Sequence, residues 1–170
     1  MNDAFTTRNP RVTLRFATID DVNLILDFIR QLADYEKMTQ DVVTDEDQLR
    51  QSLFGERPVA EVVIASYDGE AAGFALFFHN FSTFLGRPGI YLEDLFVIPQ
   101  LRGHGIGQVL LSHLAGIAIE RGCGRFEWSV LDWNTDAIRF YKRLGAKPMD
   151  GWTVFRIEGD ALEELVRLSS

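Results

Sequence analysis

A glycine-rich turn between an apolar strand and an apolar helix constrains this chain more than any other segment. The run Leu95-Phe96-Val97-Ile98 leads into Arg102-Gly103-His104-Gly105-Ile106-Gly107, and apolar residues at helical spacing follow as far as Ile117. A helix N-terminus carries unpaired N–H groups and roughly half a positive charge. Glycines let the backbone approach a bulky anion without a clash from Cβ. The segment therefore predicts a phosphate site.

The spacing of the glycines narrows the kind of phosphate site. A P-loop requires Gly-Lys followed by Ser or Thr, and this turn has no such sequence. A dinucleotide fingerprint starting at Gly103 would need its last glycine at position 108, where the chain has Gln108. The remaining pattern is Arg-x-x-Gly-x-Gly. At this point a glycine-rich turn without any ligand stays open as the alternative.

The rest of the chain alternates strand-like and helix-like segments, which predicts an α/β fold with a mixed central sheet flanked by helices. Asp68-Gly69 is typical of a two-residue β-hairpin. The segment 90–131 requires a parallel crossover, because a helix separates its two strands. We expect strands over 11–17, 60–67, 72–78, 90–97, 125–131 and 152–157, helices over 18–36, 44–53, 106–121, 134–144 and 160–168, and an irregular loop over 81–89.

Composition and charge set the broad class. A length of 170 residues with 46% hydrophobic and 25% charged residues predicts one globular domain over 11–170, preceded by a flexible N-terminal tail over 1–10. No apolar run is long enough to span a membrane. The net charge of −8 opposes binding to nucleic acid. One cysteine and three histidines lack metal-ligand spacing, so we expect no metal, and the single Cys123 fits a cytoplasmic protein.

The pattern Arg102-x-x-Gly105-x-Gly107 after a strand resembles the acetyl-CoA motif of the GNAT superfamily of N-acetyltransferases, and the element order also fits. The chain is most similar to the diamine (spermidine/spermine) and thialysine N-acetyltransferase branch of that superfamily. Several short segments carry this second likeness: Tyr91-Leu92-Glu93-Asp94, Leu131-Asp132-Trp133-Asn134, Phe140-Tyr141-Lys142, Gly151-Trp152 and the pair Ser82-Thr83. The resemblance implies a GNAT fold with a splay between the fourth and fifth strands.

The resemblance also implies the reaction, in which an amine attacks the thioester of acetyl-CoA directly in a ternary complex. An alkylamine with a pKa of about 10 is mostly protonated at pH 7, so a group must accept its proton. Glu93 is the expected acceptor, because strand alternation aims it into the cleft and turns Asp94 away. Glu36 is a second carboxylate that can hold the amine. Tyr141 matches the acid that protonates the leaving thiolate.

The cofactor contacts implied by the resemblance follow the chain from the strand to the second helix. Backbone groups of Leu95 and Val97 would pair with the pantetheine amides, and an N–H near Phe96 would stabilise the oxyanion. Asn134 would cap its helix and also meet pantetheine. The remaining expected cofactor contacts are Arg102, Gly103, His104, Gly105, Ile106, Gly107, Gln108, Asp136, Ala137 and Tyr141.

The acceptor is less closely defined by the sequence. The branch implies substrate contacts at Tyr35, Glu36, Glu93, Glu127, Trp128, Ser129 and Asp150. Polyamine members carry an acid and a tryptophan before the third strand, where this chain has Ser82 and Phe84, so a shorter, thialysine-like amine is favoured. A homodimer is expected. The rival hypotheses are a catalytically silent acyl-CoA-binding module and an acetyltransferase acting on a protein or antibiotic amine.

Overall fold

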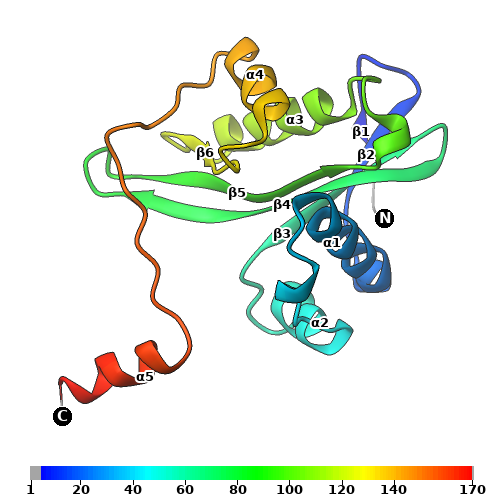
Figure 1. The fold of residues 1–170 in the computed structure, drawn as a ribbon. Helices are drawn as coiled ribbons and strands as arrows, with labels where there is room; N and C mark the ends of the chain where they lie inside the picture. The colour runs from blue at the N-terminus through cyan, green and yellow to red at the C-terminus, as the bar shows by residue number, and fades with distance from the viewer. Residues whose placement is uncertain (1–4, 170) are drawn as a thin grey trace. The chain divides into compact units, whose positions relative to one another are not determined.

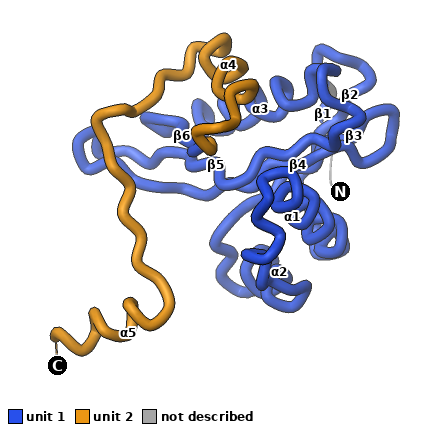
Figure 2. Tube along the Cα trace, viewed as in Figure 1, with its two compact units in different colours: residues 1–129 blue, residues 130–170 orange. Residues whose placement is uncertain are grey.

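Two compact units make up the chain, residues 1–129 and residues 130–170 (Figure 2). The computed structural model describes residues 5–169. The first unit contains six strands, β1 (Phe5–Thr6), β2 (Val12–Phe16), β3 (Glu61–Tyr67), β4 (Glu70–Ser82), β5 (Arg87–Val97) and β6 (Phe126–Trp128). Its helices are α1 (Val22–Glu36), α2 (Glu46–Phe54) and α3 (Ile106–Glu120), with short 3-10 turns η1 (Ile19–Asp21), η2 (Thr39–Asp41) and η3 (Pro99–Leu101). The second unit contains α4 (Thr135–Arg143) and α5 (Asp160–Arg167).

The six strands form one mixed sheet in the order β1-β2-β3-β4-β5-β6. Neighbours are antiparallel up to β5, whereas β6 runs parallel to β5 after the α3 crossover, which confirms the predicted mixed sheet and its crossover. Strand β1 was not predicted. Phe5 pairs with Leu14 of β2, so part of the expected tail over 1–10 is hydrogen-bonded to the sheet; residues 1–4 of that tail lie outside the described residues.

Helices cover both faces of this sheet. Figure 1 shows α1 and α2 on one face and α3 on the other. On the first face Phe28 of α1 stacks on Phe74 of β4 with ring centroids 5.5 Å apart, and Phe96 of β5 joins the same core. On the second face Ile106 and Leu110 of α3 are almost completely buried. Burial of these apolar side chains fixes the strand that precedes the glycine-rich turn and the helix that follows it.

Local turn chemistry decides the hairpin between β3 and β4. Asp68 and Gly69 have φ values of 51° and 89°, as a two-residue turn with positive φ at both positions requires, which confirms the predicted hairpin.

The expected irregular loop over 81–89 is wrong for most of its length. Strand β4 continues to Ser82, and β5 begins at Arg87 opposite it. Gly89 makes this pairing possible, because a Cβ there would come within 2.3 Å of the Asn80 side-chain oxygen. The glycine that indicated a loop in the sequence instead allows two long strands to approach closely.

Strand β5 is irregular where the candidate site begins. Asp94 pairs with Leu76 and Leu92 pairs with Phe77, which leaves Glu93 as an extra residue in a β-bulge. The pairing of β5 with β6 extends from Ile90 to Leu92 and ends opposite Trp128. Beyond that point the two strands diverge, which is the predicted splay once β1 is added to the strand count.

In the second unit, α4 ends before Gly145, whose φ of 92° suits the end of a helix, as predicted. The predicted strand over 152–157 is wrong, because the structure shows these residues without regular secondary structure. Val154 and Phe155 are 85% and 91% exposed. A strand needs a partner for its backbone N–H and C=O groups, and no strand pairs with this segment within residues 5–169.

Candidate active site

The glycine-rich turn begins α3 with a backbone that only glycine adopts readily. Gly103 and Gly105 both have φ of 82°, and Gly105 is the N-cap residue of α3. A Cβ built at either position would meet no atom of the described chain within 4 Å. The glycines are therefore needed for their backbone conformation, and the space beside them is open to a ligand. The N–H groups of the first turn of α3 can bind an anion in this space.

Arg102 is held by its neighbours in the fold. Its Nε donates a hydrogen bond to the Val97 carbonyl at 3.1 Å, and its guanidinium lies 4.2 Å from the ring centroid of Tyr35. The predicted phosphate contact thus connects the end of β5 to the last turn of α1. Tyr35, predicted to contact the acceptor, supports Arg102 in the structure.

The edge of β5 beyond Leu92 carries the residues expected to meet pantetheine. Leu95 pairs with Ala75 on the β4 side, and Phe96 is 2% exposed within the core. Their side chains therefore pack, as predicted, and only their backbone can serve a ligand. The β6-facing edge of these residues lies beyond the last β5–β6 pair. A ligand with amide groups can extend along such an edge by β-strand-like pairing.

Three carboxylates gather on the side of β5 that faces α1. Asp94 lies opposite Leu76, whose side chain packs against the core of α1 and α2. Burial and the negative charges of Glu93 and Glu36 raise the pKa of Asp94 to about 7. Burial also raises the pKa of Glu36 at the end of α1, whereas Glu93 on the bulge is exposed. Strand alternation predicts that Asp94 faces away from the cleft, but the structure groups it with both other acids.

Replacing Asp94 with asparagine is expected to stabilise the fold at alkaline pH. Because the folded-state pKa is raised, wild type loses stability as pH rises from about 4 to about 7, where the unfolded chain has already released this proton. Asp94→Asn should therefore increase the free energy of unfolding by on the order of 2 kcal/mol at pH 8 and by little at pH 4. Urea unfolding at both pH values measures the difference. Asp27→Asn, at an exposed position on α1, is the control, and an equal gain in both variants would contradict the assignment.

The predicted acceptor residues on β6 already have partners. Asn80 Nδ2 donates to Glu127 Oε2 at 2.9 Å, and Arg125 forms an ion pair with the same oxygen. Trp128 is half-buried and packs edge-on against Phe126, with ring centroids 4.9 Å apart. Ser129 shares a hydrogen bond of 2.8 Å with the Tyr91 hydroxyl. Glu127 is thus largely neutralised, whereas the acids near α1 are not paired with a cation by any described ion pair.

The second unit supplies the other predicted residues. The Asn134 side chain accepts a hydrogen bond from Ala137 N–H at 3.2 Å, so the predicted N-cap is confirmed. Tyr141 is half-buried, with its ring centroid 5.4 Å from that of Phe140. Asp136 is exposed and pairs with Arg139, and Asp150 lies in an exposed turn. The structure describes these residues within their own unit.

Sequence reasoning missed the role of Asp94 and the partners of Glu127. The bulge at Glu93 groups Asp94 with Glu36, and alternation alone does not indicate a bulge. Asn80 and Arg125 come from different strands, so no local spacing indicates that both meet Glu127.

Two further classes of site were searched for over residues 5–169. No cluster of three or more His, Cys, Asp or Glu side chains there could hold a metal ion. No helix in that range is long and apolar enough to cross a membrane.

Comparisons with known proteins assign the family. The sequence model of the Acetyltransferase (GNAT) family matches residues 26–146. The chain is 41% identical to the thialysine N-epsilon-acetyltransferase of Sus scrofa, covering 91% of this chain and 96% of the relative. It is 31% identical to an L-ornithine N5-acetyltransferase of Arabidopsis thaliana, covering 92% and 88%.

Solved structures show the same fold. An integron cassette protein from the mobile metagenome of V. cholerae matches with a TM-score of 0.77 and 30% identity over 92% of this chain and 98% of that chain. An aminoglycoside acetyltransferase from an uncultured soil metagenomic sample matches with a TM-score of 0.74, but at 16% identity it shows the fold alone, over 89% of this chain and 100% of that chain. With the family match extending from α1 to the end of α4, this chain belongs to the Acetyltransferase (GNAT) family and is an acetyltransferase.

Proposed function

We propose that this enzyme transfers the acetyl group of acetyl-CoA to a primary amine of a small molecule, a thialysine-like amino acid or a short diamine. The observation that carries the proposal is the group of Glu36, Glu93 and Asp94 on the strand that leads to the turn before α3. A cationic amine is attracted by such a group, and its proton needs an acceptor. The names of the thialysine and ornithine acetyltransferases support the same class of acceptor.

The residues present fit acetyl-CoA as donor. Its phosphates would be held by the N–H groups of the turn at Gly103 to Gly107, where the backbone leaves open space. Backbone groups of Leu95 and Val97 would hold the pantetheine part, together with Asn134, Asp136 and Ala137. When bound, acetyl-CoA supplies a thioester whose carbonyl carbon accepts the amine.

Two side chains would move protons in this reaction. The carboxylate of Glu93 accepts the proton of the amine, directly or through water, as the new C–N bond forms. The hydroxyl of Tyr141 gives its proton to the sulfur as the C–S bond breaks. Asp94, with a pKa of about 7, lies beside Glu93 and is the second candidate acceptor, because a group with a pKa near the working pH transfers protons efficiently.

The distribution of charge favours a short acceptor. The acids near α1 attract one ammonium group, whereas Glu127 is neutralised by Arg125 and Asn80. Ser82, which stands where polyamine enzymes carry an acid, accepts a hydrogen bond from the Leu85 N–H in the β4–β5 turn. A long polyamine would therefore find few carboxylates for its distant ammonium groups.

A panel of amines tests this preference. Thiol release from acetyl-CoA should give kcat/KM values for thialysine, lysine and ornithine that exceed those for spermidine and a lysine peptide by about tenfold or more, roughly the value of one unpaired ammonium group. Preference for the peptide, or for an aminoglycoside, would instead support a protein or antibiotic amine as acceptor. Binding of acetyl-CoA without thiol release for any amine would support a silent binding module.

We further propose that the enzyme acts as a cytoplasmic homodimer. The second unit supports the dimer, because Trp152, Val154 and Phe155 are 75%, 85% and 91% exposed, and apolar side chains gathered in this way mark interaction surfaces. The single Cys123 suits a reducing compartment. Light scattering should give twice the mass of the chain, and a monomer at all concentrations would contradict the dimer.

A further inference from the structure

We propose that the N-terminal segment Thr7 to Asn9 is part of the donor's phosphate site. Asn9 would position the turn, and Arg8 would add a cation for the phosphates. The segment precedes residues 26–146, which match the family, so the match assigns it no role. The inference rests on the proposed function, because it takes acetyl-CoA as the donor.

Asn9 is bound to the turn and is itself firmly held. Its Nδ2 donates a hydrogen bond to the His104 carbonyl at 3.3 Å, and its Oδ1 accepts one from the Arg11 N–H at 3.1 Å. The Thr7 hydroxyl donates to the Asn9 carbonyl at 2.8 Å, and Val12 N–H donates to the same carbonyl at 2.9 Å. Asn9 is therefore anchored to β2 and carries a fixed side chain to the turn.

The geometry of the peptide group explains why this bond matters. In a planar trans peptide the carbonyl and the following N–H point in opposite directions. Asn9 holds the His104 carbonyl on the side of the N-terminal segment, so the Gly105 N–H points away from that side. This keeps the carbonyl oxygen, which would repel an anion, out of the phosphate site and aims an N–H donor towards it.

The His104 side chain is fixed as well. Its ring packs edge-on against Tyr67, with centroids 5.1 Å apart, and Arg11 stacks on the other ring contact of Tyr67 at 4.3 Å while forming an ion pair with Asp68. The hairpin between β3 and β4 and the N-terminal segment thus support the turn together. Glycine residues at positive φ make the turn flexible, so such supports lower the cost of ordering it for a ligand.

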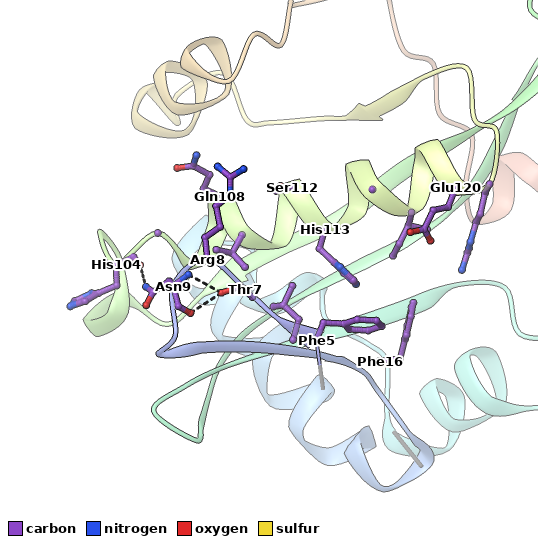
Figure 3. Close-up of a pocket in the computed structure, with 16 residues that line it drawn as sticks. Phe5, Thr7, Arg8, Asn9, Phe16, His104, Gln108, Ser112, His113 and Glu120 are labelled. Carbon is purple, nitrogen blue, oxygen red and sulfur yellow. Dashed lines mark hydrogen bonds between the residues drawn. The ribbon is translucent and has the colours of Figure 1, made fainter. Parts of the chain in front are cut away.

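Arg8 carries the positive charge of the segment to the start of α3. Figure 3 shows its side chain beside Gln108 in the first turn of that helix, at one end of a cavity of about 840 Å³ between the segment and α3. Arg8 is exposed, and no ion pair of Arg8 is found within residues 5–169. Coenzyme A carries a pyrophosphate and a ribose phosphate, and Arg102 is occupied by Val97 and Tyr35. An additional guanidinium at this place suits such a polyanion.

Calorimetry with CoA and kinetics with two donors test the proposal. Asn9→Ala should raise the Kd for CoA about five- to tenfold, the usual effect of one hydrogen bond that orders a charged site. Arg8→Ala should raise it about threefold or more, and less at high salt, because an exposed charge is screened. With S-acetylpantetheine, which lacks the nucleotide phosphates, both variants should keep kcat/KM within about twofold of wild type.

The controls remove the same groups elsewhere. Gln31→Ala removes an exposed amide from α1, and Arg57→Ala removes an exposed guanidinium from the connection between α2 and β3. Neither should change the Kd for CoA. Unchanged CoA affinity in Asn9→Ala and Arg8→Ala would overturn the inference, as would an equal loss with both donors, which a merely structural role predicts. Failure of wild type to bind CoA would instead overturn the proposed function.

Discussion

Gly105→Val is expected to weaken binding of acetyl-CoA by about a hundredfold or more. The position has φ of 82°, where a β-branched residue costs about 1–3 kcal/mol of backbone strain. A Cβ there meets no atom of the described chain, so the valine side chain would project into the space that the phosphates need. The fold should survive and the donor site should not. Calorimetry with CoA measures the loss.

Gly86→Val provides a matched control for this change. Gly86 lies in the turn between β4 and β5 with φ of 61°, and a Cβ there also meets nothing within 4 Å. Both variants should lose similar stability, measured by thermal unfolding, but only Gly105→Val should lose CoA binding. If the two variants bound CoA as tightly as wild type, the turn would not be the phosphate site.

Tyr141→Phe is expected to lower kcat by about a hundredfold, in the range of the contribution made by one general acid. The change removes the hydroxyl that protonates the leaving sulfur and keeps the ring that packs beside Phe140. The Kd for CoA should therefore stay within about twofold of wild type. Stopped-flow measurement of thiol release with saturating amine gives the rate of the chemical step.

Phe140→Leu distinguishes this chemical role from a packing role. It alters the neighbouring aromatic on α4 without removing a proton donor, so it should lower stability more than it lowers kcat. Equal kcat values for Tyr141→Phe and wild type would remove Tyr141 from the reaction. An equal fall in both variants would indicate that α4 packing, rather than the hydroxyl, limits turnover.

Features set by neighbouring residues could be predicted from the sequence. Asp68-Gly69 gives a hairpin because the turn needs positive φ at both residues. Asp45 caps α2 by accepting a hydrogen bond from the Gln48 N–H at 2.8 Å, and Asn134 caps α4 in the same way. The strand-turn-helix unit before α3 was likewise predicted, because its apolar period changes at Ile106.

Features that depend on distant partners were missed. Strand β1 forms because Phe5 pairs with Leu14, and the extension of β4 and β5 depends on the close approach at Gly89. The apolar residues over 152–157 alternate like a strand, but a sequence pattern does not supply a partner strand. In the site, the bulge at Glu93 gives Asp94 its surroundings, and the hydrogen bond from Asn9 to the turn joins residues far apart in the chain.

The central claim concerns one reaction, the transfer of acetyl from acetyl-CoA to a small primary amine. Mass spectrometry of a reaction with thialysine measures it most directly, because the acetylated amine and free CoA can be quantified together. The account predicts equal amounts of both products, formed only when enzyme, acetyl-CoA and amine are all present. Free CoA without acetylated amine, or no products from an enzyme that binds acetyl-CoA, would contradict it.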